Sequence, residues 1–293
     1  MKNSSKTIKI IFGFLVLGLT TACSKDDPTA PIPNSTEAVY RIKQKTIASN
    51  GNVINYEYTP QNQISKITYP NGKIEKYNYN SQGVLLSFQV SGNPPGGPNN
   101  YTANYLYNTT GIKTEELFNN LDDAGQPSSK QKIEYQTNTQ GLPTKTTYYN
   151  WNSTNSLWVL SNYFVSTYND KKQLLKNDYY NSTGFSTLNY SFTYDSKGNK
   201  NESKEYQRKP DNSFYLSYQF NVTFDDKKAI QNFNGQSDAN NTIDMVSKTF
   251  AVDGSVSNQN SATQSYEYNE AGYVTKIFYN GVLSATYNLE KVN

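Results

Sequence analysis

The sequence predicts an all-β protein: an antiparallel up-and-down meander of repeated hairpins that forms a curled single sheet or a barrel-like shell. Three observations lead to this fold class. A short aromatic phrase recurs along residues 38–293, turn signals separate the alternating segments, and no stretch after residue 23 has apolar residues at i, i+3, i+4 and i+7 over three turns. The 293-residue chain therefore divides into an N-terminal leader and one β-repeat domain.

Residues 1–22 are typical of a secretory signal peptide. Lys2, Lys6 and Lys9 are the only charged residues among them, and an apolar run from Ile10 to Leu19 follows. The run is far shorter than the ~20 residues that a membrane-spanning helix needs. Small residues follow it, as they do at a signal cleavage site. The alternative, a buried amphipathic helix, would not stop at such residues.

Cys23 is the only cysteine, and Leu19–Cys23 resembles the lipobox of bacterial lipoproteins, in which the cysteine becomes the first mature residue and carries lipid on its sulfur. The segment departs from that pattern because Thr20, rather than leucine, stands three places before the cysteine. Ordinary cleavage near Ala22 is the alternative. A lone thiol exported to an oxidising compartment has no partner, which favours lipidation and a membrane anchor.

The next residues, Ser24, Lys25, Asp26 and Asp27, resemble the surface-export signal of Bacteroidetes lipoproteins, flavobacterial ones especially. This resemblance implies an outer-membrane lipoprotein that faces the cell exterior, and the alternative is a solvated charged linker. Residues 23–37 also contain three prolines, which favour extended conformations. We therefore expect a tether between the lipid and a domain over residues 38–293.

The repeated phrase reads aromatic, any residue, Tyr, Asn or Asp, two residues and Gly. Alternating aromatics predict a strand with one half-buried face. Asn or Asp then opens a turn by bonding its own backbone, and the Gly closes the turn in the left-handed conformation. Clear copies span Tyr77–Gly83, Tyr105–Gly111, Phe192–Gly198 and Tyr266–Gly272, and weaker copies are anchored on Tyr58, Tyr135, Tyr168 and Phe224. Eight such units predict about sixteen strands.

A three-residue hairpin loop with a bulge fixes the strand register of each unit. It pairs Asn80 with Val84 and therefore Tyr79 with Leu85. The same spacing predicts the pairs Tyr58–Ile64, Tyr107–Lys113, Tyr168–Leu174, Tyr194–Lys200, Phe224–Ile230 and Tyr268–Val274. Most of these pairs are aromatic against aliphatic, and such a pair stabilises a sheet by roughly 0.2–1 kcal/mol.

A second turn signal, an aromatic residue followed by Asn, is expected to close each unit. Asn-Gly between alternating segments is the strongest short hairpin signal, and it occurs at Asn280-Gly281. The other instances are Tyr69–Gly72, Phe118-Asn119, Tyr149-Asn150, Tyr180-Asn181 and Phe233-Asn234. The long gap between Phe224 and Tyr268 is expected to hide a degenerate hairpin around residues 250–255.

The repeats resemble the YD, or RHS-like, repeats of bacterial cell-surface proteins. Tyr77–Leu85, Tyr194–Gly198 and Tyr266–Val274 carry the likeness best. In RHS proteins such repeats roll into a spiral β-shell, and the large members enclose a C-terminal toxin, which we do not expect here. Smaller repeat lipoproteins of Bacteroidetes, mostly uncharacterised, are a closer likeness. The resemblance implies a curled sheet or barrel-like shell and no assigned activity.

Composition excludes several classes of function. With no His and one Cys, the chain cannot form a Ser-His-Asp triad, an HExxH zinc site or an internal disulfide, and we expect no metal or cofactor. Without the three leader lysines, the basic residues equal the 24 acidic ones, so nucleic acid is not an expected partner. The alternate strand positions are Thr, Asn, Glu, Gln and Lys, which disfavours a barrel whose outer face meets lipid.

Two tryptophans, Trp151 and Trp158, flank a polar tip between two predicted strands, beside Tyr148 and Tyr149. A flat apolar ring beside amide donors is what sugar binding needs. These four residues are therefore the candidate ligand-binding residues. The alternative is that both tryptophan rings pack on the sheet.

We expect a non-enzymatic surface binding or structural module whose partner is a glycan or an envelope protein. The alternatives are a glycan hydrolase, which needs two carboxylates and no His, and a scaffold or adhesin of a secretion system. Carboxylates that could serve a hydrolase are Glu115, Glu116, Asp122, Asp123, Glu202 and Glu205. The oxygen-rich segments Asp238–Asp244 and Asp195–Glu202 lack the spacing of a calcium loop and are interpreted as turns.

Overall fold

The structure is a computed structural model that describes residues 39–92, 100–122, 125–228 and 240–292. The expected signal peptide, the lipidation site Cys23, the export signal Ser24–Asp27 and the rest of the tether lie outside the described residues. Among the residues that are described, no helix is long and apolar enough to cross a membrane.

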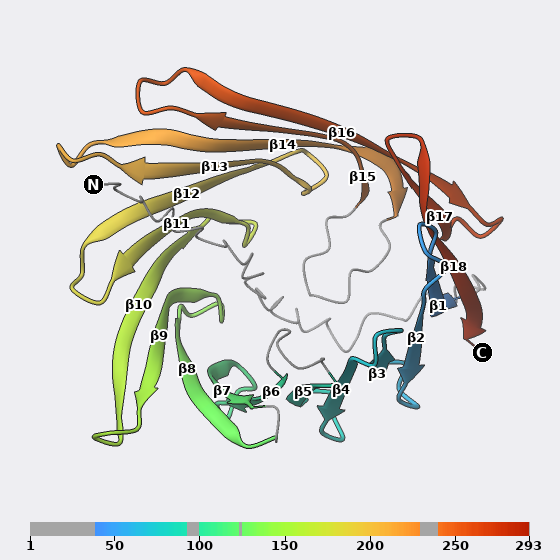
Figure 1. The fold of residues 1–293 in the computed structure, drawn as a ribbon, viewed down its shortest axis with the longest axis horizontal. Helices are drawn as coiled ribbons and strands as arrows, with labels where there is room; N and C mark the ends of the chain where they lie inside the picture. The colour runs from blue at the N-terminus through green and yellow to red at the C-terminus, as the bar shows by residue number, and fades with distance from the viewer. Residues whose placement is uncertain (1–38, 93–99, 123–124, 229–239, 293) are drawn as a thin grey trace, which may run out of the picture.

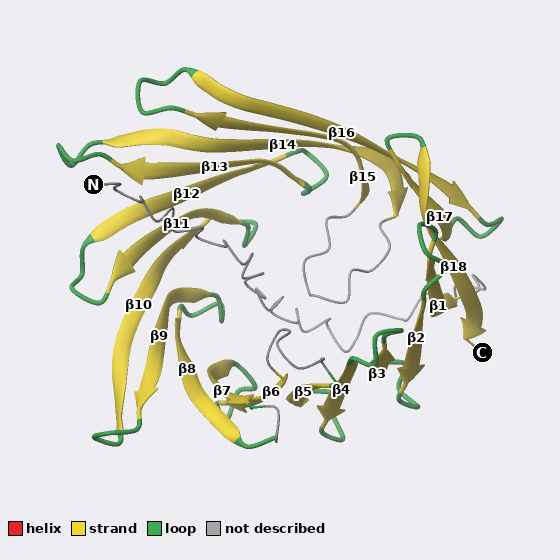
Figure 2. Ribbon diagram, viewed as in Figure 1, coloured by secondary structure: helices red, strands yellow, loops and turns green. Residues whose placement is uncertain are grey.

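The described chain is built of antiparallel β-strands, as the alternating sequence pattern predicts (Figure 2). In chain order the strands are β1 (Val39–Ile47), β2 (Val53–Tyr58), β3 (Ile64–Thr68), β4 (Ile74–Tyr79), β5 (Leu85–Ser91), β6 (Asn100–Tyr107), β7 (Lys113–Leu121), β8 (Pro127–Thr137), β9 (Pro143–Asn152), β10 (Leu157–Tyr168), β11 (Leu174–Asn181), β12 (Ser186–Tyr194), β13 (Lys200–Arg208), β14 (Phe214–Lys228), β15 (Asn240–Phe250), β16 (Val256–Tyr268), β17 (Val274–Tyr279) and β18 (Val282–Val292).

Each strand pairs with the next strand along the chain, and β1 also pairs with β18. This last pairing runs from Val39 opposite Val292 to Ile47 opposite Ala285. The 18-stranded sheet is therefore a closed up-and-down barrel, seen end on in Figure 1. The predicted meander and barrel-like shell are confirmed. The strands exceed the expected sixteen because β1 and β18 flank the repeat units.

Alternation along each strand gives the sheet a tyrosine face and a polar face. In β4, Glu75 is buried and Tyr77 half-buried, whereas Lys76 and Asn78 are exposed. Pairing continues the tyrosine face into β5, where Phe88 lies opposite Tyr77. Side chains on the concave side of a closed sheet converge, and those on the convex side diverge. The more buried tyrosine face therefore lines the interior, and the polar face points outward.

The turns that follow the even-numbered strands lie at one end of the barrel, which we call the tyrosine rim. In the turn after β4, Asn80 donates its NH to the carbonyl oxygen of Val84 at 2.9 Å, and Asn80 Oδ1 accepts the NH of Gln82 and of Val84. Tyr79 therefore lies opposite Leu85, as predicted. The predicted pairs Tyr58–Ile64, Tyr107–Lys113, Tyr168–Leu174, Tyr194–Lys200 and Tyr268–Val274 are also confirmed.

One predicted pair and one predicted anchor residue differ from the structure. Phe224 lies opposite Thr242 rather than Ile230, because the chain between β14 and β15 is longer than a three-residue loop. In the unit assigned to Tyr135, Thr137 takes the anchor position opposite Pro143. Tyr135 is two residues earlier, on the same face of β8.

The turns that follow the odd-numbered strands lie at the opposite rim. The predicted turns are found at residues 69–73, 181–185, 251–255 and 280–281. Two further predictions are wrong, because Phe118-Asn119 and Tyr149-Asn150 lie inside β7 and β9. Phe233-Asn234 lies outside the described residues. An aromatic residue followed by Asn is thus a weaker turn signal than Asn-Gly.

At the tyrosine rim, tyrosine hydroxyl groups join neighbouring strands that a turn connects only at the opposite rim. The hydroxyl of Tyr79 on β4 donates to the carbonyl oxygen of Ile64 on β3 at 2.9 Å. The same bond joins Tyr58 to Ile42, Tyr107 to Leu85, Tyr168 to Pro143 and Tyr194 to Leu174, at 2.6, 2.7, 3.0 and 3.0 Å. We call these contacts tyrosine bridges, and they alternate with turns around this part of the rim.

Candidate ligand-binding surface

Trp151 on β9 and Trp158 on β10 lie directly opposite each other across the hairpin. Their ring centroids are 5.1 Å apart and their planes meet at 66°, an edge-to-face arrangement. Both side chains are half-buried, while the turn residues between the two strands are exposed. The rings therefore pack on each other and still present part of their surface to solvent, a mixture of the two predicted arrangements.

Tyr149 shares the outer face with the tryptophans, because it is two residues before Trp151 on the same strand. Lys132 on β8 lies opposite Tyr149. Its Nζ is 4.7 Å from the Tyr149 ring centroid and 5.4 Å from that of Trp158. Lys130 approaches Trp151 in the same way, at 5.8 Å. Cations at these distances are attracted to the electron-rich faces of the rings.

The same outer face continues onto the next strands. Tyr163 of β10 stacks on Tyr180 of β11, with ring centroids 4.8 Å apart and planes 7° from parallel. Lys145 Nζ lies 4.4 Å from the Tyr163 centroid. We call the set Tyr149, Trp151, Trp158, Tyr163 and Tyr180 the aromatic face. Tyr163 and Tyr180 were not among the predicted residues. Tyr163 is five residues after Trp158, so simple alternation would place it on the other face, and it reaches this face because of the register shift between Leu160 and Asn162.

Tyr148 belongs to the interior rather than to the aromatic face. It lies opposite Ile133, and its ring meets Phe164 edge-to-face at 5.9 Å. Burial, and then the charge of Glu116, raise the pKa of the Tyr148 phenol. The structure therefore brings together three of the four predicted ligand-binding residues, and Tyr148 points to the other side of the sheet.

Two glutamates are buried on the tyrosine face. Glu75 accepts hydrogen bonds from the hydroxyls of Tyr69 and Tyr77, at 3.0 and 2.9 Å, and pairs with Lys73 Nζ at 2.6 Å. Burial, and then the charge of Glu75, raise the pKa of both phenols. The carboxylate thus has the partners that a buried charge requires.

Glu116 is held in a similar way. It accepts a hydrogen bond from the Tyr135 hydroxyl at 2.7 Å and pairs with Lys113, and the side chains of Lys113 and Glu116 are only 8% and 9% exposed. Burial and the charge of Glu116 raise the pKa of Tyr135. Both buried glutamates are therefore paired with a lysine and hydrogen-bonded by tyrosine, an arrangement that offsets the cost of burying their charges.

The adjacent carboxylates that could have served a hydrolase lie on opposite faces of the sheet. Glu115 and Glu116 are consecutive in β7, and Glu202 and Glu205 are three residues apart in β13, so strand alternation separates each pair. Glu202 binds Lys204 and Glu205 binds Ser217. Asp122 follows β7 in a turn, and Asp123 lies outside the described residues. These neighbours therefore cannot act together on one glycosidic bond.

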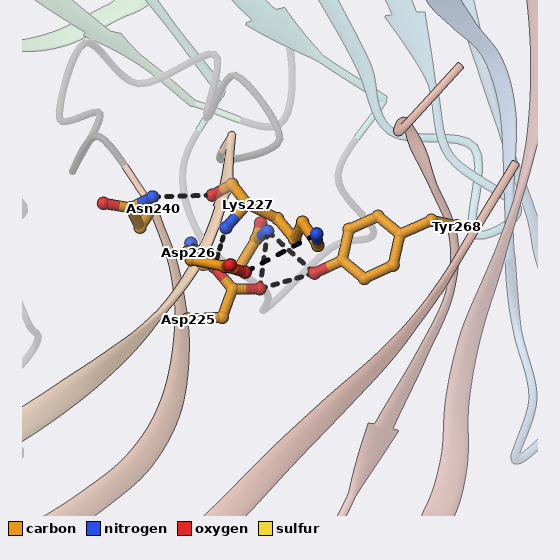
Figure 3. A network of polar contacts seen from close by, with 6 residues as sticks. Asp225, Asp226, Lys227, Asn240 and Tyr268 are labelled. Atoms are coloured by element: carbon orange, nitrogen blue, oxygen red, sulfur yellow. Dashed lines mark hydrogen bonds and ion pairs between the residues drawn. The ribbon is translucent and has the colours of Figure 1, made fainter. Parts of the chain in front are cut away.

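A polar network ties β14 to β15 and β16 where the tight turn is absent (Figure 3). The Asp225 carboxylate accepts the Tyr268 hydroxyl at 2.5 Å and the Asn241 NH at 3.0 Å. Asn240 Nδ2 donates to the carbonyl oxygen of Lys227 at 2.9 Å. Burial, and then the bond to Asp225, raise the pKa of Tyr268. The network holds the end of β14 and the start of β15 in register. The Tyr268 hydroxyl donates to Asp225 here, in place of the backbone carbonyl that a tyrosine bridge uses.

The candidate calcium segments behave as turns where they are described. Asp195 Oδ1 accepts the backbone NH of Lys197 and of Asn199, both at 2.9 Å, which is the pattern of a hairpin turn. Asp238 lies outside the described residues. No group of three or more His, Cys, Asp or Glu side chains that could hold a metal ion occurs within the described ranges.

A closed β-barrel built from hairpin repeats, with an aromatic and lysine-rich patch on its outer face, is the class of protein that this geometry defines. No protein-family model matches the chain. No curated protein matches it either.

Similar solved structures include two porin-like proteins and a toxin complex. The protein from Bacteroides uniformis is 12% identical, with a TM-score of 0.43 and coverage of 84% of this chain and 95% of that one. The protein from Bacteroides vulgatus is 11% identical, with a TM-score of 0.39 and coverage of 85% and 97%. The TcdB2–TccC3–Cdc42 structure is 12% identical, with a TM-score of 0.33 and coverage of 77% and 12%. The assignment to a closed barrel rests on the strand pairing of this chain itself.

Proposed function

We propose that this chain is a non-enzymatic surface lipoprotein of the outer membrane, related to the YD-repeat lipoproteins of Bacteroidetes, that binds a glycan on its aromatic face. The observation that carries the glycan proposal is the Trp151–Trp158 pair, held rigidly by opposing strands on the outer surface. The lipid anchor at Cys23 and the exterior location rest on the leader sequence.

The aromatic face supplies the two contacts that a sugar ring needs. The apolar C–H face of a pyranose can stack on Tyr149, Trp151 or Trp158, and Lys130 and Lys132 lie close by as donors to hydroxyl groups. Because β9 and β10 are paired along this stretch, the rings are already in place before binding. Such preorganisation lowers the entropic cost of association.

Replacing both tryptophans should abolish glycan binding. We expect a Trp151→Ala, Trp158→Ala double variant to lose retention on every glycan that retains the wild-type chain on a glycan array, because the stacking surface is removed. Tyr279→Ala is the matched control, since Tyr279 is an exposed aromatic residue of β17, outside the aromatic face. Unchanged binding by a double variant with wild-type circular dichroism would exclude this surface. If no glycan retains the wild-type chain, the glycan-binding proposal is wrong, and the role of a structural module remains.

Replacing Cys23 should release the protein from the membrane. We expect a Cys23→Ala variant to move from the membrane fraction to the soluble fraction, because each CH₂ of a buried acyl chain contributes about 0.8 kcal/mol to anchoring. An Asp26→Asn, Asp27→Asn variant is the control for location: it should stay in the membrane fraction but become resistant to protease added to whole cells. Retention of Cys23→Ala in the membrane would contradict lipidation.

A further inference from the structure

β16 has a free edge at the rim opposite the tyrosine rim, as does β10, whose residues Leu157–Leu160 pair only with β9. β16 pairs with β15 from Val256 to Thr263, but its pairing with β17 starts only at Gln264. In Figure 1 the β15–β16 hairpin reaches the upper left of the view, whereas β17 and β18 lie at the right. Within the described residues, the stretch Val256–Ala262 therefore pairs with β15 on one side and with no strand on the other, and we call it the free edge.

The backbone groups of the free edge point away from β15 at alternate residues. Thr263 accepts the NH of Asn280 and donates its own NH to Asn280 Oδ1, both at 2.8 Å, so its polar groups face the β17 side. Alternation along the strand then turns the NH and C=O of Ser261 and Gln259 to that side, where no strand is paired. Residues 256–261 are all exposed.

The free edge lacks the features that usually prevent strand association. It contains no proline and no charged residue, although charges and prolines are the common protection of edge strands. The one-sided stretches of β1 and β18 differ in this respect, because they contain Arg41, Lys43, Glu290 and Lys291.

The sequence of the free edge is symmetric about Gln259. Ser257 and Ser261 lie at equal distances from it, as do Asn258 and Asn260, and the ends are the small apolar residues Val256 and Ala262. An antiparallel pairing of two copies centred on Gln259 would therefore place Ser opposite Ser, Asn opposite Asn and Gln opposite Gln. Such polar pairs form hydrogen bonds across strands.

We propose that two copies of this chain associate through β16, with the two free edges antiparallel about a two-fold axis at Gln259. Each Gln259 exchanges two backbone hydrogen bonds with its counterpart, as in any directly opposed hydrogen-bonded pair. The interface is isologous and closes at two copies. The two barrels lie at opposite ends of the joint, because each β16 enters its own barrel beyond Thr263.

Exposed apolar side chains at both ends of the free edge agree with this pairing. Val252, in the turn before β16, is 54% exposed, and Val282, two residues after Asn280, is 70% exposed. In the antiparallel arrangement the β15–β16 turn of one copy approaches the β17–β18 turn of the other. Val252 would thereby lie near Val282 of the second copy and remove apolar area from water, which is favourable.

Proline at the centre of the free edge tests the proposal. The NH of Gln259 points outward, so Gln259→Pro removes no ladder bond within one chain but blocks pairing between chains. Gln259→Lys does the same through two like charges on the axis. Gln259→Ala is the matched control for the first variant because it keeps the NH. Asn104→Lys is the control for the second, because Asn104 is an exposed residue of β6 paired on both sides.

Sedimentation equilibrium of the purified full chain provides the measurement. We expect the wild type, Gln259→Ala and Asn104→Lys to dimerise with rising concentration, and both other variants to associate about tenfold more weakly or worse. Circular dichroism reports folding, and Gln259→Lys decides the outcome if the proline variant fails to fold. A wild type that stays monomeric, or a folded Gln259→Lys that dimerises like the wild type, would overturn the proposal.

Discussion

The hydroxyl group gives tyrosine a role at the tyrosine rim that phenylalanine could not fill. Six tyrosines donate to a carbonyl oxygen of the preceding strand, at the rim where no turn connects the two strands. The repeated phrase predicted that its aromatic residues, mostly Tyr, lie on the half-buried face of each strand. The bonding partner of the tyrosine hydroxyl was not predicted, because it lies on a neighbouring strand whose position depends on the whole sheet.

Removing one tyrosine bridge should destabilise the barrel modestly. We expect Tyr79→Phe to lower the free energy of unfolding by about 0.5–1.5 kcal/mol, because the variant loses one hydrogen bond to the carbonyl of buried Ile64. Urea unfolding measures the change. Tyr279→Phe is the control: Tyr279 is 46% exposed, so its free energy of unfolding should stay within about 0.5 kcal/mol of the wild type. Equal losses in both variants would contradict the role of the bridge.

Strand parity also decides which predicted site residues act together. Tyr148 and Tyr149 are consecutive in β9, so one must point inward when the other points outward. The sequence placed both beside the tryptophans, and only the register of β8 and β9 shows that Tyr149 is the outer one. The sequence thus predicted that aromatic residues would form the binding surface, but not which of them. That depends on which residues point to the outer face of the sheet.

Hairpins are the elements whose register the sequence determines most strongly. Where Asn or Asp and Gly stand at fixed spacing, as at Asn80 and Gly83, the turn bonds itself and the pairing of Tyr79 with Leu85 follows. The prediction fails for Phe224, because the segment after β14 carries no such spacing. There a network around Asp225 and Tyr268 performs the alignment instead.

Turn positions at the opposite rim are less predictable for a physical reason. The strands there differ in length, and β9 and β10 continue past the predicted turn at Tyr149-Asn150 to a tip at residues 153–156. Tyr149 and Asn150 pair with Leu160 and Val159 instead of turning. Cross-strand packing of aromatic residues, including the tryptophans, thus outweighs the weak local preference of Asn for a turn.

Closure is a property of the whole molecule, and it could not be read from local pattern. The sequence left a curled sheet and a barrel-like shell as alternatives, because the deciding contact joins β1 to β18, at opposite ends of the described chain. Arg41 pairs with Glu290 across this junction at 2.5 Å, and the Arg41 guanidinium lies over the Tyr58 ring at 4.4 Å. These side chains link the junction to the first tyrosine bridge.

The interior tyrosines should make the barrel sensitive to alkaline pH. Burial raises the pKa of Tyr58, Tyr190 and Tyr287 from 10.0 to about 12, so the folded state holds these protons more tightly than the unfolded state. Their stabilising contribution is complete below pH 10 and is lost as the pH rises from 10 towards about 12.

We therefore expect unfolding and phenolate formation by the interior tyrosines to occur together in this range. A pH titration followed in parallel by far-ultraviolet circular dichroism and by phenolate absorbance measures both. Ionisation of all the tyrosines near pH 10, with the strand signal unchanged, would contradict the prediction.

A ring of strands in which Val39 lies opposite Val292 has no obligatory starting point. Because the first and last strands are neighbours, a peptide linker between them, combined with a cut at any tight turn, would keep every strand pairing of the barrel. Circular permutation would then move the N-terminal segment, in which we propose the lipid anchor, to a different position around the rim. In the proposed lipoprotein, the aromatic face could in this way be turned toward or away from the membrane without changing a residue of the sheet.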